Sequence, residues 1–323
     1  MKKILIVRYE HIGDYGLTIS PIASIRRAFP EAQIDIVVGP WNKKFAEATP
    51  YVNNVIVFDN PLVKRNISYG DILKIILFKF FKIKKHLKEL EKKNYDILID
   101  FSDRKFSLIL DKMIKAKKKI LGTDYPYIGE REVDRMNRIL AESLGIKKIV
   151  KRGILNFSEK DKKVVTDLIK KFKKGNQKII LVHPIASVIE KDWPLDKLKK
   201  LIKEIAAKRK DLMFFLLGGP EQEKEILEIE NQIKLPNVKS IAGKLDLLQL
   251  VLLMHKSDLI FGGDSAPVHL AELTKIPIIT LYGPSDHRRW GPPKGQGIIV
   301  KGDTIKDIKA KDILKAINHF IKI

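Results

Sequence analysis

Residues 2–20, KKILIVRYEHIGDYGLTIS, carry the pattern from which the fold is predicted. The apolar run ILIV predicts a buried strand, Gly13 and Gly16 predict a loop, and a helical pattern follows. This order is typical of a parallel α/β unit whose helix N-terminus holds a phosphate. Asp14 argues against a phosphate here, because a fixed carboxylate would repel it, and the loop lacks the three glycines of the dinucleotide fingerprint. Asp14 therefore either caps the helix or serves chemistry other than phosphate binding.

The alternation of strands and helices continues along the whole chain. In the first half, strands are predicted near 2–8, 33–38, 54–58, 95–101 and 118–122, and helices near 16–28, 71–93, 104–115 and 130–144. In the second half, strands are predicted near 178–183, 212–217, 238–242, 258–262 and 277–282, again with helices between them.

Ten strands would be unusual in one sheet, so the pattern predicts two facing Rossmann-like α/β domains with parallel sheets. Their expected bounds are 1–160 and 161–323, with the junction within 150–175. A final helix, near 310–322, is a candidate for packing back toward the first domain.

Composition excludes several classes of protein. The 323 residues include no cysteine, which removes disulfides, thiol catalysis and cysteine metal sites, and which fits a reducing compartment. Only four apolar residues follow Lys2 and Lys3, too few for a signal peptide. No apolar run approaches the roughly 20 residues that span a bilayer. We therefore expect a cytoplasmic protein, either free or peripheral on the inner face of the cytoplasmic membrane.

The net charge of +23 leaves several partners open. Such an excess attracts nucleic acid, an anionic membrane or phosphorylated substrates, and it also fits a merely lysine-rich surface. Most of the excess is lysine, whereas readout of base edges favours the arginine fork, so nucleic acid is not expected as a partner.

Among the loops that follow predicted strands, LIFGGDSAPVHL at 259–270 is the most informative. Glycines at 262 and 263 let the backbone approach a ligand, Asp264 or Ser265 suits an N-cap, and Pro267 suits the first helical turn. A helix starting there would present free N–H groups to a diphosphate, with His269 facing the same pocket. The alternative is a capped core helix in which His269 only packs.

Three further loops have similar ambiguity. Gly283-Pro284, followed by HRRW at 287–290, would either close over an anion or form a surface loop. In HPIASVIEK at 183–191, Lys191 would either pair with a phosphate or remain a solvated lysine. After Gly219, Glu221 would either accept hydrogen bonds from ribose hydroxyls or favour a helix N-terminus.

Taken together, the loops resemble glycosyltransferase family 9, the ADP-heptose:lipopolysaccharide heptosyltransferases. The resemblance covers nearly the whole chain, through residues 4–40, YDILIDFS at 95–102, HPIAS and KDWP within 183–194, GGDSAPVHLAEL at 262–273 and LYGPSDHRRWGP at 281–292. It implies the GT-B fold, a first domain that mainly binds the acceptor, a second that mainly binds the nucleotide-sugar, and no metal or other cofactor.

The resemblance also assigns roles to residues. Asp14, in an acceptor-side loop with Gly13 and Gly16, is implied as the general base. Lys191 is implied as a catalytic cation that neutralises the departing diphosphate together with the helix start at Ser265–His269. The implied nucleotide-sugar site comprises His183, Ser187, Lys191, Gly219, Glu221, Gly263, Asp264, Ser265, Ala266, His269 and Gly283.

The implied function is that of an inverting glycosyltransferase, with an ADP-heptose-like donor and a lipopolysaccharide core or related glycan as acceptor. Two alternatives remain open: a nucleotide-sugar epimerase of the same architecture, and a nonenzymatic basic nucleic-acid-binding protein. The chain departs from the family pattern at Ile185 and Ala266, where glycine is common, and both side chains are expected to narrow the approach of the backbone to a ligand.

The stretch DILKIILFKFFKIKKHLKEL at 71–90 predicts a long helix with a basic and aromatic surface. One face is apolar and should be core, whereas a second set of side chains mixes rings with cations: Lys74, Phe78, Phe81, Lys82 and Lys85. This set fits a helix that lies against an anionic membrane. A helix that is buried on two sides, or one that forms a dimer contact, would also explain this mixture of rings and cations.

Overall fold

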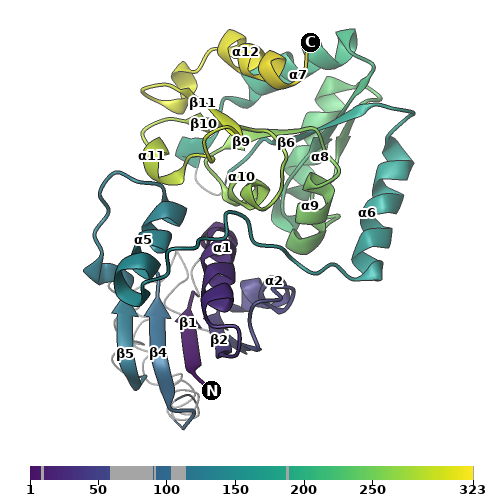
Figure 1. The fold of residues 1–323 in the computed structure, drawn as a ribbon. Coiled ribbons are helices and arrows are strands. Elements are labelled where there is room, and N and C mark those ends of the chain that lie inside the picture. The colour runs from purple at the N-terminus through teal and green to yellow at the C-terminus, as the bar shows by residue number, and fades with distance from the viewer. Residues whose placement is uncertain (9–10, 59–89, 91, 103–113, 187–188, 323) are drawn as a thin grey trace, which may run out of the picture. The chain divides into compact units, whose positions relative to one another are not determined.

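The computed structural model describes residues 1–8, 11–58, 90, 92–102, 114–186 and 189–322. They divide into two compact units, Met1–Leu155 (unit 1) and Asn156–Ile323 (unit 2), each shown in Figure 1. The boundary expected at 160/161 falls in the first turn of α6 (Glu159–Phe172), just after the start of unit 2.

Unit 1 contains a five-stranded sheet of β1 (Lys3–Val7), β2 (Gln33–Val38), β3 (Asn54–Val57), β4 (Tyr95–Asp100) and β5 (Ala116–Leu121). The strand order is β3-β2-β1-β4-β5, and each described pairing is parallel, as predicted. The chain proceeds outward from β1 to β3 and then returns to the other side of β1. The topological switch point, where open α/β sheets bind ligands, therefore lies between β1 and β4.

The helices described in unit 1 are α1 (Ile12–Ala28), α2 (Lys43–Glu47) and α5 (Glu132–Leu144), with short 3-10 turns at Pro40–Asn42 and Gly122–Asp124. Helices α1 and α5 pack against each other beside the sheet (Figure 1). The prediction that α1 starts near residue 16 was wrong. Gly13 and Gly16, which are typical of a loop, lie within the first part of the helix. The helices predicted near 71–93 and 104–115 lie almost wholly outside the described residues.

Unit 2 contains a six-stranded sheet of β6 (Lys178–His183), β7 (Leu212–Leu216), β8 (Val238–Ser240), β9 (Leu259–Gly263), β10 (Ile278–Tyr282) and β11 (Gly297–Lys301). The order is β11-β10-β9-β6-β7-β8, again with parallel pairings. Strand β11 was not predicted, because its short apolar run follows a loop rich in glycine and proline. The switch point of this sheet lies between β9 and β6.

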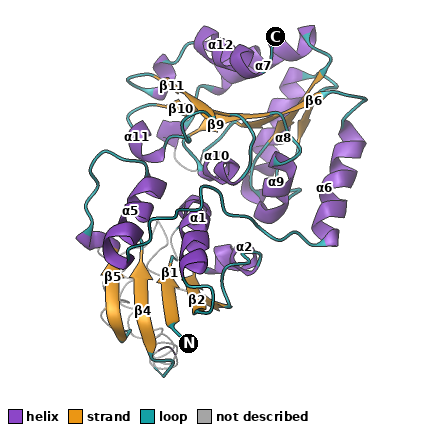
Figure 2. Cartoon of the chain, in the orientation of Figure 1, coloured by secondary structure: helices purple, strands orange, loops and turns teal. Residues whose placement is uncertain are grey.

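Helices cover both faces of the unit 2 sheet (Figure 2). On one face lie α7 (Leu195–Lys208), α8 (Glu223–Ile233) and α12 (Ala310–Phe320), and toward the other lie α6, α9 (Leu247–Met254) and α10 (Ala266–Leu270). A four-residue helix, α11 (His287–Trp290), follows β10, and 3-10 turns occupy Ile189–Lys191, Pro220–Gln222, Ala271–Leu273 and Ile305–Asp307. Helix α12 packs on α7, β10 and β11 of its own unit.

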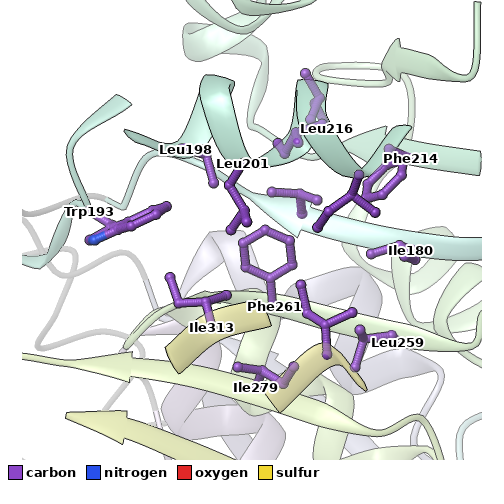
Figure 3. Close-up of a cluster of buried hydrophobic side chains, with 14 of the residues drawn as sticks. Ile180, Trp193, Leu198, Leu201, Phe214, Leu216, Leu259, Phe261, Ile279 and Ile313 are labelled. Atoms are coloured by element: carbon purple, nitrogen blue, oxygen red, sulfur yellow. The ribbon is translucent and has the colours of Figure 1, made fainter. Parts of the chain in front are cut away.

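The core between the sheet and α7, α8 and α12 is continuous (Figure 3). It takes every second residue of the central strands, such as Phe214 and Leu216 of β7, while Phe215 points to the opposite face and meets Phe172 of α6. Because both faces are covered, the strands are apolar along nearly their whole length. This packing fixes the strand ends on which the loops of the candidate site are built.

Candidate functional site

The sheet topology of unit 2 brings the four predicted loops to neighbouring positions. They follow β10, β9, β6 and β7, which are consecutive in the sheet. Carboxyl ends of parallel strands share one edge, so residues far apart in sequence meet there. The two inner loops, after β9 and β6, flank the switch point.

A hydrogen bond joins these two inner loops directly. The Ser265 hydroxyl lies 3.0 Å from His183 Nδ1 and donates to the Gly263 carbonyl oxygen at 3.0 Å. Because the Ser265 hydroxyl donates its hydrogen to that carbonyl, its oxygen acts as an acceptor toward His183. This arrangement requires the His183 tautomer with a hydrogen on Nδ1. Ser265 holds the N-cap position of α10, but its side chain does not cap the helix. A Cβ on Gly262 would lie 2.9 Å from the His183 Cβ, so a larger residue would push the two loops apart.

Burial lowers the pKa of His183 from 6.5 to about 4. His183 is therefore protonated near pH 6.5 in the unfolded chain but only near pH 4 in the folded chain. The free energy of unfolding should consequently fall as the pH drops through this window, by about 3 kcal/mol in total.

The variant His183→Asn should remove this contribution while its side chain still reaches Ser265. Urea unfolding at pH 7, 5.5 and 4 measures the effect, and the wild type should lose stability more steeply than the variant. Other histidines contribute equally to both proteins, so parallel pH profiles would contradict the assignment.

Asp264 forms the charged centre of the site. Its carboxylate is almost fully buried, forms an ion pair with the Lys191 ammonium through Oδ2, and lies 3.1 Å from His269 Nε2 through Oδ1. Burial alone would raise its pKa, but the hydrogen bonds and charges of His269 and Lys191 prevail and lower the pKa to about 2. The N-cap role considered for Asp264 is not observed. Within the described residues, His269 Nδ1 is buried without a hydrogen-bond partner.

A cavity of about 310 Å³ opens beside this centre. Lys191, Asp264 and Gly283 line it, together with Glu190 and Ser285, which the sequence analysis did not select. A Cβ on Gly263 would collide with the Lys191 carbonyl oxygen, and one on Gly283 would lie 2.7 Å from the Ile305 nitrogen. These two glycines are therefore required by contacts within the protein.

The other described residues predicted for the donor site do not line this cavity. Gly219 and Glu221 belong to the loop after β7 and do not line the cavity; Glu221 is exposed. Ala266 is the half-buried first residue of α10. Ser187 lies outside the described residues. The Ile185 side chain is buried in the hydrophobic core of unit 2, so it does not narrow the cavity.

The HRRW segment forms α11. The Asp286 side chain caps it by accepting from the Arg288 N–H at 3.0 Å and also holds the Arg288 guanidinium at 3.0 Å. The Trp290 ring lies 6.0 Å from the His269 ring and carries the Arg289 guanidinium at 4.8 Å from its centroid. This aromatic segment thus packs beside the partner of Asp264.

In unit 1, Asp14 lies at the carboxyl end of β1, beside the switch point. It is the third residue of α1, and its Oδ2 accepts the His11 backbone N–H at 3.2 Å. Gly13 and Gly16 are buried in the same helix, not in a loop as predicted. Arg8, which the sequence analysis did not select, places its Nη2 3.6 Å from Asp14 Oδ1. Asp14 therefore caps the helix, and its side chain remains 16% exposed.

No metal-binding group of three or more His, Cys, Asp or Glu side chains occurs in the part of the chain that the structure describes. The helices described there also include none with the length and apolar character needed to cross a membrane. The residues proposed for membrane contact, Lys74, Phe78, Phe81, Lys82 and Lys85, lie outside the described residues.

Comparison with known proteins defines the class. Residues 83–318 match the model of glycosyltransferase family 9 (heptosyltransferase). The chain therefore belongs to this family and is a glycosyltransferase. The expected family and the GT-B fold class, at the level of two parallel-sheet α/β units, are confirmed.

Individual relatives agree with the family. The chain is 28% identical to lipopolysaccharide heptosyltransferase 3 of Escherichia coli K12 over 88% of this chain and 83% of that protein. A family 9 glycosyl transferase from Veillonella parvula superposes with a TM-score of 0.82 at 19% identity, covering 99% of this chain and 97% of that one. The E. coli ADP-heptose lps heptosyltransferase II superposes with a TM-score of 0.75 at 19% identity, covering 99% and 98%. These two structural likenesses concern the fold.

The epimerase alternative is supported only distantly. A protein from Listeria monocytogenes described as a UDP-N-acetylglucosamine 2-epimerase superposes with a TM-score of 0.58 at 12% identity, covering 100% of this chain and 89% of that one. That likeness is weaker than those to the transferases and again concerns the fold. Membership of a transferase family also removes the nonenzymatic alternative.

Proposed function

We propose that this enzyme transfers heptose, with inversion, from an ADP-heptose-like donor to a lipopolysaccharide core or related glycan. The observation that carries the proposal is the paired Lys191 and Asp264 in a cavity at the switch point of unit 2. The names of the curated relatives, lipopolysaccharide heptosyltransferases among them, support the choice of sugar and acceptor.

On the donor side, Lys191 supplies the charge that the leaving diphosphate requires. An ammonium has three N–H donors, of which one suffices for Asp264, and the Lys191 side chain is 33% exposed. The remaining donors can reach a phosphate while Asp264 holds the side chain in place. His183, Ser265 and His269 complete the proposed donor site, together with Ser187, Gly219, Glu221, Gly263, Ala266 and Gly283.

On the acceptor side, Asp14 acts as the general base. The attacking hydroxyl gives its proton to the carboxylate while its oxygen bonds to the anomeric carbon. The bond from that carbon to the diphosphate oxygen breaks, and its electron pair leaves with the diphosphate. This single displacement inverts the anomeric centre and uses no metal or other cofactor in the proposed scheme. Residues 1–160 thus serve the acceptor and 161–323 the donor.

Nucleotide-sugars should raise the Tm of the protein, and those that bind more tightly should raise it more. A ligand that binds only the folded state at 100 times its Kd adds about 2.7 kcal/mol to the free energy of unfolding. We expect the largest rise in Tm with ADP-heptose, a smaller one with ADP, and little with UDP-N-acetylglucosamine.

A larger shift with the UDP-sugar would contradict the choice of donor. Product analysis separates the reaction classes, because an epimerase would convert its donor without any acceptor. A transferase should form product only when the glycan is added.

Attachment to the inner membrane surface is a separate proposal that rests on the sequence of residues 71–90. Vesicles with anionic lipid should bind the wild type more tightly than the double variant Phe78→Ser/Phe81→Ser, because the inserted rings contribute apolar burial. Equal sedimentation of both proteins with the vesicles would remove the proposal and leave the transfer reaction unaffected.

A further inference from the structure

Arg8 directly follows β1 and contacts the proposed base. Its side chain is only 2% exposed, its Nε donates to the Asp14 backbone oxygen at 3.3 Å, and its Nη2 lies 3.6 Å from Asp14 Oδ1. One guanidinium thus contacts both the backbone and the carboxylate of the same residue. A guanidinium is always protonated, so a permanent positive charge stands beside this carboxylate.

The two oxygens of Asp14 have different partners. Oδ2 accepts the His11 backbone N–H, which ties it to the start of α1. Among the described residues, Oδ1 accepts no hydrogen bond, since the distance from Arg8 is that of an ion pair and not of a hydrogen bond. Oδ1 is therefore the oxygen with a lone pair available for an incoming proton.

We infer that Arg8 is a positioning residue for the transfer reaction: its guanidinium contacts both the backbone oxygen and the carboxylate of Asp14 and fixes that side chain with Oδ1 available to the acceptor hydroxyl. This inference rests on the proposed role of Asp14. Arg8 is too deeply buried to bind a substrate group itself.

A double-mutant cycle with Asp14→Asn tests the inference. In the wild-type background, Arg8→Met should lower kcat about 10- to 100-fold and leave the KM of the donor within about twofold. In the Asp14→Asn background, the same change should alter kcat less than about threefold, because no base remains to be positioned. Arg8→Lys keeps the charge and should recover most of the rate.

Arg26 offers a matched control at the far end of α1. Its guanidinium bonds the carbonyl oxygens of Tyr51, Pro30 and Ala32, so Arg26→Met should lower Tm while its effect on kcat stays equal in both backgrounds.

The outcomes separate this inference from the proposed function. Equal losses from Arg8→Met in both backgrounds would overturn the positioning role and leave the base intact. Near-normal turnover of Asp14→Asn alone would overturn the base role itself. If Arg8→Met does not fold, Arg8→Gln, which keeps a polar side chain but removes the charge, takes its place in the cycle: a larger loss of kcat in the wild-type background than in the Asp14→Asn background supports the inference, and equal losses overturn it.

Discussion

Asp14→Asn should lower kcat at least about 100-fold and leave the fold unchanged. The amide has nearly the shape of the carboxylate, and its oxygen can still accept the His11 N–H that caps α1. It cannot take up a proton, so the acceptor hydroxyl must attack without a base. Steady-state rates with saturating donor and acceptor measure the effect, and thermal unfolding checks the fold.

Asp134→Asn is the matched control. Asp134 is also the third residue of a helix in unit 1, α5, and it is exposed. Both substitutions remove one negative charge near a helix N-terminus, and Asp14→Asn also removes an ion-pair partner of the buried Arg8, so it should cost somewhat more stability than the control. Only the change at residue 14 should affect turnover. A kcat for Asp14→Asn close to that of the control would refute the base role.

Lys191→Met should lower kcat/KM for the donor about 100-fold or more, because the variant loses the cation that meets the departing diphosphate. It should also destabilise the protein. Asp264 would keep His269 but lose its ammonium partner, and a buried carboxylate with fewer partners is costly. Adding Asp264→Asn to Lys191→Met should restore part of the stability and none of the activity.

Lys239 provides the comparison for this second result. It pairs with Glu230 at 2.8 Å, its side chain is 30% exposed, and it belongs to β8, outside the cavity. Lys239→Met should therefore leave kcat/KM within about twofold. If Lys191→Met behaved like Lys239→Met toward the donor, leaving-group stabilisation by Lys191 would be excluded.

Much of the fold follows from the sequence because parallel strands buried on both faces are continuous apolar runs. Ten of the eleven strands described are predicted, most of them from such runs, although β5, AKKKIL, is largely exposed; β11 is missed because its run is short. The start of α1 is misplaced because glycines at 13 and 16 resemble a loop, although both are buried within the helix.

The candidate site is predictable only in part, since its contacts join residues that are distant in sequence. An Asp before a helix reads as an N-cap, yet Asp264 pairs with Lys191, which lies on the loop after a different strand. Arg8 gives no signal among 62 basic residues; its position at a strand end before Gly-Asp is the one feature that sets it apart. The strand order of the sheet, which cannot be read from the sequence, brings Lys191 and Asp264 together.

If the cavity holds the donor as proposed, the tight fit around Gly283 limits how this enzyme can acquire a different donor. Gly283 lines the cavity, and a Cβ there would meet the main chain of Ile305, so no side chain can be introduced at that position without moving the backbone. Variation has room at Glu190 and Ser285, whose side chains border the same space. Attempts to redirect the enzyme to another sugar, by natural divergence or in the laboratory, should therefore begin with those two positions.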